Sequence, residues 1–148
     1  MEAYKNLYLT QLNQLKEEIK SYRHTENIWK NPGGINNNSG NLCLHICGNL
    51  NYFIGEVIGK SGYVRDRDSE FSEMNLPSEK LLEKIDETID MTGKLFDNAD
   101  SNILNSVYPL DKFGKNVTNG FVLARLVSHL SYHLGQINYH RRIVEGQQ

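Results

Sequence analysis

The sequence predicts an all-α protein built as a four-helix bundle. Four segments carry apolar residues at intervals of three to five, which is the period of an amphipathic helix. No segment has a convincing strand pattern of sheet-forming length, and the chain has no internal repeat. Four amphipathic helices bury their apolar stripes most simply against one another. Because a chain of 148 residues can bury roughly two thirds of its unfolded surface, we expect a single bundle domain over residues 1–148.

The first predicted helix covers residues 3–23, where charged and amide side chains separate the members of an apolar stripe, namely Tyr4, Leu7, Leu12, Leu15, Ile19 and Tyr22. Residues 31–40 combine a proline, glycines and asparagines that a helix interior tolerates poorly, so they predict a loop. The second helix begins at Asn41, and its stripe runs to Val57 and ends in the glycine-rich residues 59–62.

Residues 63–77 form the predicted connection to the third helix. The charges of alternating sign in residues 65–71 have no apolar period, so we interpret this segment first as solvated surface and second as a substrate contact. Phe71 is expected to pin it to the bundle. If Arg65 or Arg67 faced the candidate site instead, an anionic substrate would be favoured.

The third helix is predicted from Ser78, a suitable N-cap, to about Phe96. Residues 97–117 hold turn-forming residues between short apolar groups, which predicts a turn or a small hairpin. Thr118 or Asn119 then opens the last helix. Along one side of that helix lie Val122, Leu126, His129, Leu130, His133 and Ile137.

Charge and composition exclude several classes of partner. The 16 Lys and Arg residues against 18 Asp and Glu give a net charge of −2, so no nucleic-acid partner is expected. No apolar run approaches the ~20 residues of a membrane span, and residues 1–6 do not begin a targeting signal. Cys43 and Cys47 are four residues apart in a predicted helix, a spacing poorly matched to a disulfide. We therefore expect a cytoplasmic protein with no membrane partner.

Three histidines form the candidate site. His129 and His133 are four residues apart, which places both side chains on one helix face. His45 lies on the apolar stripe of the second helix, where a buried polar ring needs a partner. Three imidazoles from two facing helices can occupy three corners of a tetrahedron and leave the fourth to water or substrate, as in a catalytic zinc-type site. Asn49 and Gln136 lie near the same face and could orient the ligands or a bound molecule, or be core amides without function.

Three segments resemble those of a known family. The run His129-Leu130-Ser131-Tyr132-His133-Leu134-Gly135-Gln136-Ile137 is similar to the C-terminal histidine motif of the DinB-like family of metal-dependent proteins. Residues 40–50 resemble the helix that carries the first histidine of that family, and residues 65–71 resemble a charged segment of one uncharacterised branch.

The resemblance covers the whole chain and implies a DinB-like bundle with His45, His129 and His133 as the metal ligands. His24 and His140 have no place in the family pattern. Better characterised members are S-transferases and an isomerase that use bacillithiol, mycothiol or another low-molecular-weight thiol. The resemblance also makes a homodimer a reasonable expectation.

These observations lead to three hypotheses. The first is an enzyme in which a divalent zinc or nickel ion activates a thiol or water toward a small-molecule substrate, in a pocket that Trp29 helps to wall. The second is a non-catalytic metal-binding or small-molecule-binding bundle. The third is a structural role for hydrogen-bonded histidines without metal. A metal-dependent hydrolase is a weaker variant of the first, because the carboxylates are expected away from the histidines and no general base is evident.

Overall fold

The computed structural model describes residues 1–146 and confirms the all-α prediction. Its helices are α1 (Glu2–Lys20), α2 (Ser39–Leu50), α3 (Arg67–Ser72), α4 (Ser78–Asn98) and α5 (Asn119–Val144). Short 3-10 turns form η1 (Thr25–Trp29), η3 (Ile103–Asn105) and η4 (Asp111–Phe113), and the π-helical segment η2 (Asn51–Glu56) continues α2. Within residues 1–146 there is no β-strand, although an isolated antiparallel bridge joins Val107 to Thr118 in the predicted turn region.

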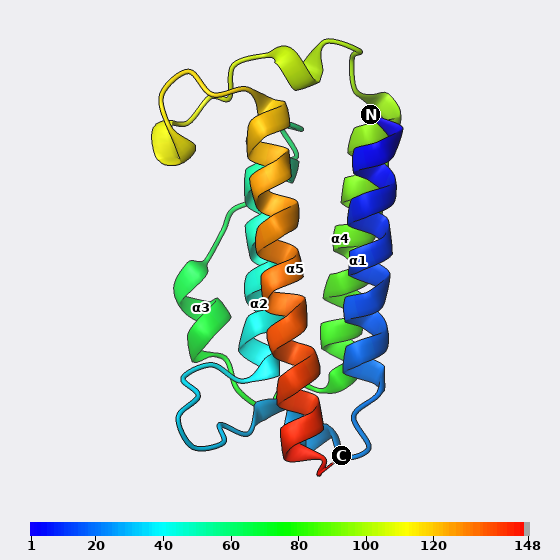
Figure 1. Ribbon diagram of the computed structural model, residues 1–148, viewed down its shortest axis with the longest axis vertical. Helices are drawn as coiled ribbons and strands as arrows, with labels where there is room; N and C mark the ends of the chain where they lie inside the picture. Colours follow the sequence, from blue (N-terminus) through cyan, green and yellow to red (C-terminus); the bar gives the residue numbers. More distant parts are fainter. Residues whose placement is uncertain (147–148) are drawn as a thin grey trace.

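The four long helices form a bundle in which α1 and α5 run in one direction and α2 and α4 run in the other (Figure 1). Helix α1 packs against α4 and α5, and α2 packs against the same two helices. Because α2 and α4 are parallel, the chain must return along the bundle between them, and this return segment carries α3. The long connection therefore lies against α2 rather than extending into solvent.

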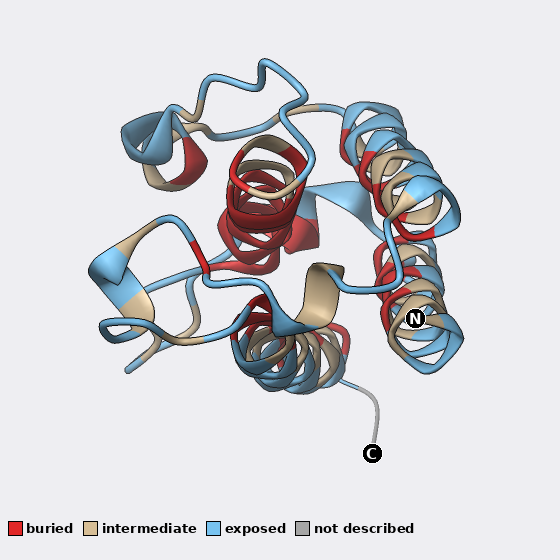
Figure 2. Ribbon diagram, turned by 90° about the horizontal axis from the view of Figure 1, so that it is seen from above, coloured by how far each residue is buried: buried red, intermediate tan, exposed pale blue. Residues whose placement is uncertain are grey.

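Helix α2 is the centre of the molecule, and all twelve of its residues are buried (Figure 2). It has neighbours on every side, since η1, α3, α4 and α5 all contact it. Glycines permit two of these close approaches: a Cβ at Gly40 would overlap the Trp29 ring, and a Cβ at Gly48 would overlap the Glu70 carboxylate. The interior is therefore built around a helix with small residues at two of its contact points.

Several helix boundaries differ from the predicted ones by one to three residues. Helix α1 ends at Lys20 rather than near residue 23. Helix α2 begins two residues before Asn41, because the Asn38 side chain caps it by accepting a hydrogen bond from the Asn41 backbone N–H. Ser78 is the first residue of α4 rather than its N-cap, which is Pro77. The prediction for α5 is confirmed, since the Thr118 side chain accepts from the Phe121 N–H.

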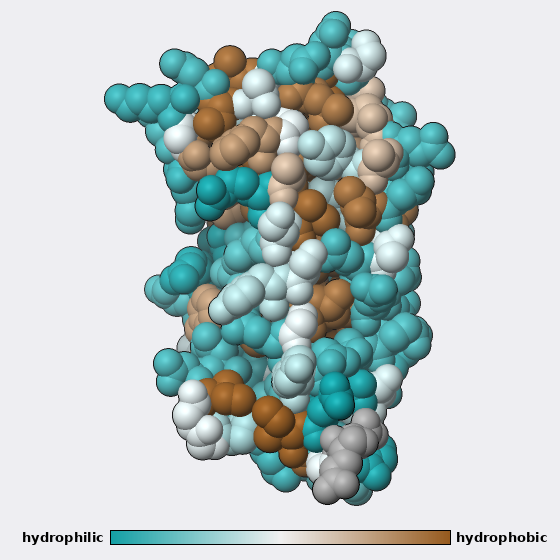
Figure 3. Space-filling view, in the orientation of Figure 1, coloured by the Kyte–Doolittle hydropathy of each residue, from teal (hydrophilic) through white to brown (hydrophobic). Residues whose placement is uncertain are grey.

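The surface is mixed in character. The face seen in Figure 3 carries groups of hydrophobic side chains separated by hydrophilic ones. Among residues 1–146, no helix combines the length and the apolar character that a membrane crossing requires.

Candidate metal centre

The structure brings the three predicted histidines together from two antiparallel helices. His45 lies on α2, while His129 and His133 lie one turn apart on α5. Each offers one ring nitrogen to a cluster whose members are all within 4.8 Å of one another. The Nε2 atom of His129 is 3.4 Å from His45 Nε2 and 3.0 Å from His133 Nε2. This group could hold a metal ion.

The other ring nitrogens of His45 and His133 face hydrogen-bond acceptors. His45 Nδ1–H donates to Glu70 Oε2 at 2.9 Å, and His133 Nδ1–H donates to Gln136 Oε1 at 2.7 Å. A neutral imidazole that donates from Nδ1 has a lone pair on Nε2. His129 Nε2 can carry at most one proton, so it can donate to only one of its two neighbours. The three Nε2 atoms thus share at most one proton and cannot all be paired by hydrogen bonds. A bound cation would accept a lone pair from each of them.

The spacing of the nitrogen atoms also fits an ion. Two nitrogens that each lie about 2.0–2.1 Å from a tetrahedral zinc are roughly 3.3 Å apart. The observed separations of 3.0 and 3.4 Å fall on either side of this value. The residues present therefore fit a site in which three nitrogens bind one ion.

Burial and nearby charged groups keep the two α5 histidines neutral, which is the form that can bind a metal ion. Burial, together with the nearby His133, His45, Arg65 and Lys112, lowers the pKa of His129 to about 4. Burial also lowers the pKa of His133, although the hydrogen bond to Gln136 acts in the opposite direction. Both rings are consequently neutral at pH 7, which is the protonation state that binds metal.

The interpretation of residues 65–71 as solvated surface is wrong for Arg65 and Glu70. Only 9% of the Arg65 side chain and 6% of the Glu70 side chain are exposed, and Arg65 Nε donates to Glu70 Oε1 at 2.7 Å. Burial alone raises the pKa of the Glu70 carboxyl, but hydrogen bonds from His45 and Arg65 bring it below its ordinary value. The two charges are buried as a compensating pair. Arg67 and Asp68, in contrast, are exposed as predicted.

The expectation that carboxylates lie away from the histidines is also wrong, because Glu70 touches His45. Periodicity could not reveal this contact, since the helix that carries Glu70 has only six residues. Asp66 was the available signal: its side chain caps α3 by accepting from the Ser69 N–H. Finding that helix would have placed Glu70 and Phe71 on an ordered element, and the Phe71 ring centroid is 5.0 Å from that of His45.

The remaining candidate residues occupy different places. Gln136 contacts His133 directly. Asn49 is buried one turn after His45, and its Oδ1 has no hydrogen-bond partner among the described residues. Trp29 lies against Gly40, at the beginning of α2, and its Nε1–H donates to the Leu76 carbonyl at 3.2 Å.

The two other histidines lie outside the cluster. His24 is exposed. His140 is buried, and its two ring nitrogens contact the Tyr22 hydroxyl and the Lys30 carbonyl, each at 2.7 Å.

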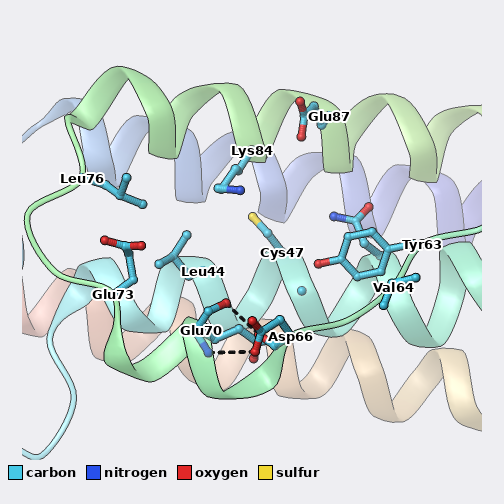
Figure 4. A pocket seen from close by; sticks show the side chains of 13 residues that line it. Leu44, Cys47, Tyr63, Val64, Asp66, Glu70, Glu73, Leu76, Lys84 and Glu87 are labelled. Carbon is cyan, nitrogen blue, oxygen red and sulfur yellow. Dashed lines mark hydrogen bonds between the residues drawn. The ribbon is translucent and has the colours of Figure 1, made fainter.

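A cavity of about 190 Å³ lies on another side of Glu70, between α2, α4 and the 63–76 connection (Figure 4). Cys47 from α2 and Lys84 from α4 point into it. The histidines are not among the residues that line it. Glu70 is therefore a wall shared by the cavity and the histidine cluster.

Fold and site together define an all-α bundle with three converging histidines that could hold a metal ion. The chain belongs to the family described as protein of unknown function (DUF1572), whose sequence model matches residues 1–148. Searches of curated proteins and of solved structures found no significant match.

Proposed function

We propose that this protein is a metal-dependent enzyme of the DinB-like superfamily, in which His45, His129 and His133 bind a divalent zinc or nickel ion. The supporting observation is the convergence of three Nε2 atoms, with the Nδ1 atoms of His45 and His133 already engaged by other partners. The activity that we propose is thiol-dependent group transfer to a small electrophile, resembling that of S-transferases. A cytoplasmic location and a homodimeric assembly are part of this proposal.

The charges around the cluster favour an anionic reactant. Neutral histidines leave the full charge of a bound divalent ion uncompensated, and Glu70 does not offset it because Arg65 neutralises that carboxylate. When bound, the ion would stabilise a thiolate and thereby supply a nucleophile at neutral pH. The charge of the Arg65 side chain is already balanced by the Glu70 carboxylate, so the stabilisation of an anionic thiol rests on the ion itself.

Hydrolysis is less well supported, although a carboxylate lies at the site. A general base must be free to accept a proton from water. Both oxygens of Glu70 already accept hydrogen bonds, Oε1 from Arg65 and Oε2 from Arg65 and His45. Glu70 is therefore suited to holding His45 rather than to activating water.

Activity assays of metal-loaded protein test the proposal. Protein prepared without a histidine tag would be loaded with zinc or nickel and assayed with several low-molecular-weight thiols and a panel of electrophiles. A metal-dependent hydrolysis screen would run beside it, with His45→Ala as the comparison. We expect thiol consumption that requires both metal and His45. Equal rates for the two proteins, with metal bound to the wild type, would favour the non-catalytic binding bundle. An absence of metal binding by the wild type would favour hydrogen-bonded histidines with a structural role.

A further inference from the structure

Glu70 connects the histidine cluster to the short helix α3. Its Oε2 accepts from His45 Nδ1 at 2.9 Å and from Arg65 Nη2 at 2.8 Å, and its Oε1 accepts from Arg65 Nε at 2.7 Å. Arg65 therefore binds the carboxylate through two nitrogens, which fixes the plane of the carboxylate as well as its position. With all these donors satisfied, the carboxylate presents an acceptor of defined direction to His45.

The backbone of α3 is attached to α2 independently of this ion pair. The Asn41 side-chain amide donates to the carbonyls of Glu70 and Glu73, at 3.1 and 2.9 Å. Asp66 caps the beginning of the helix, and Phe71 packs on the His45 ring. Loss of the Glu70 carboxylate alone would thus leave α3 with several of its contacts to α2.

Gly48 provides the space that the carboxylate occupies. It lies one turn from His45 on α2, and a Cβ at this position would overlap Oε1 and the carboxyl carbon of Glu70. The overlapping atoms are the end of a flexible side chain, so an alanine would displace the carboxylate without requiring a backbone shift. A glycine inside a helix costs up to about 1 kcal/mol of stability relative to alanine. The packing of Glu70 against Gly48 offsets this loss of helix stability.

We propose that Glu70 is the positioning residue of the metal centre: it holds His45 as the Nδ1–H tautomer, with the Nε2 lone pair directed at His129. Metal-ligating histidines commonly donate their second ring nitrogen to a carboxylate, and such partners raise metal affinity without touching the ion. The relevance of this assignment to metal binding rests on the function proposed above. The tautomer of His45, in contrast, can be measured in the metal-free protein.

Three variants test the assignment. Glu70→Gln keeps the shape of the side chain, but an amide cannot accept on both sides, so either Arg65 or His45 loses its acceptor. Gly48→Ala keeps every residue of the site and displaces only the carboxylate. Glu145→Gln is the matched control, because Glu145 is also buried and paired with an arginine, Arg23, at the end of α5.

Two measurements separate positioning from a purely structural role. Long-range ¹H–¹⁵N spectra of the imidazoles in metal-free protein report the tautomer of His45. Zinc affinity by chelator competition, with the visible spectrum of the cobalt-substituted protein, reports the metal site. We expect both Glu70→Gln and Gly48→Ala to shift His45 away from the Nδ1–H form and to weaken zinc binding by roughly 10–100-fold. Combining the two substitutions should add little, because they remove the same contact.

The outcomes distinguish this assignment from the proposed function. Glu145→Gln should leave both measurements at their wild-type values. An unchanged His45 tautomer in Glu70→Gln and Gly48→Ala would overturn the assignment, whether or not the protein binds metal. Unchanged zinc affinity and cobalt spectra in a wild-type protein that does bind metal would overturn it as well. If the wild type binds no metal, the function proposed above fails, and the tautomer measurement still decides the role of Glu70.

Discussion

His45 and His133 differ in the partner that holds each ring. His45 donates to a buried carboxylate, whereas His133 donates to an amide, that of Gln136, which also donates through its Nε2 to the Tyr132 hydroxyl. Hydrogen bonds to ionised groups are roughly twice as strong as those between neutral groups. We therefore expect the His45 ring to be held more rigidly than the His133 ring, and Glu70 to matter more for metal binding than Gln136.

The first prediction concerns one of the three proposed ligands. His133→Ala removes one of three nitrogens and should weaken zinc binding by more than the roughly 10–100-fold typical of losing a partner of a ligand. The ring lies at the rim of an already formed core, so helical content should stay the same. Chelator competition measures the affinity, and circular dichroism measures the helical content. His24→Ala, which changes an exposed histidine outside the cluster, is the control. Unfolding of His133→Ala, or unchanged affinity, would contradict the prediction.

At the scale of single residues, the sequence predicts the three histidines but not the Glu70 carboxylate that contacts His45. The spacing of His129 and His133 and the apolar surroundings of His45 are visible in the sequence, because each depends on a helical period. Glu70 is close to His45 only because residues 57–77 return along α2 and Arg65 neutralises the charge during burial. Neither the path of a connection nor the pairing of its charges leaves a periodic signal.

Among the helices, α2 has the strictest requirements, because it contacts its neighbours all around its circumference. The Trp29 ring of η1 lies directly on Gly40. Gly93 of α4 differs: nothing lies within 4 Å of the position that its Cβ would occupy. The same substitution should therefore have opposite effects in the two helices.

The second prediction compares these glycines. Gly93→Ala should raise the free energy of unfolding by about 0.5–1 kcal/mol, because alanine is the better helix former. Gly40→Ala should lower it by about 1–3 kcal/mol, because the added methyl group forces the Trp29 ring out of a close-packed position. Urea unfolding followed by circular dichroism measures both changes. A stabilising effect of Gly40→Ala would show that packing on α2 is looser than the structure indicates, and a destabilising effect of Gly93→Ala would contradict the prediction for α4.

Helix length explains which elements the sequence predicts. The four long helices each repeat their apolar stripe several times, so their existence is predictable even where their ends are not. Helix α3 and the 3-10 turns are too short to repeat a stripe, and tertiary contacts such as that of Asn41 with α3 hold them in place. The elements that the sequence does not predict are thus those that depend on contacts with their neighbours.

Across the whole molecule, α5 is tied to the connection between α1 and α2. Arg23 Nε and the Asn27 side-chain amide donate to the two oxygens of the buried Glu145 carboxylate, at 3.0 and 2.7 Å. His140 is held between Tyr22 and the Lys30 carbonyl. These contacts join residues more than 100 positions apart in the chain, so they report on the closure of the whole bundle.

The third prediction is a pH dependence of stability. Burial by itself raises the pKa of the Glu145 carboxyl, but the hydrogen bonds from Asn27 and Arg23 outweigh it and lower the pKa from 4.5 to about 2. A carboxyl whose pKa is lower in the folded state stabilises the protein above its unfolded pKa. This contribution should be complete above about pH 5 and should disappear as the pH falls from about 4.5 toward 2.

Urea unfolding of the wild type and Glu145→Gln at several pH values tests this directly. The difference in their free energies of unfolding should be large at pH 7 and should shrink between pH 4.5 and pH 2. A difference that stays constant over this range would show that Glu145 is not ionised in the folded protein.

The division of the histidine cluster between α2 and α5 has a consequence for the growing polypeptide. His45 leaves the ribosome 84 residues before His129, in a segment that also contains Cys43 and Cys47. An unstructured chain offers these two thiols and the imidazole to the same ion, and thiolates attract zinc and copper strongly. Once α2 is folded, Cys47 points toward α4 while His45 points toward α5. Packing of α2 against these two helices therefore separates the cysteine thiols from the His45 imidazole, which the unstructured chain offers together.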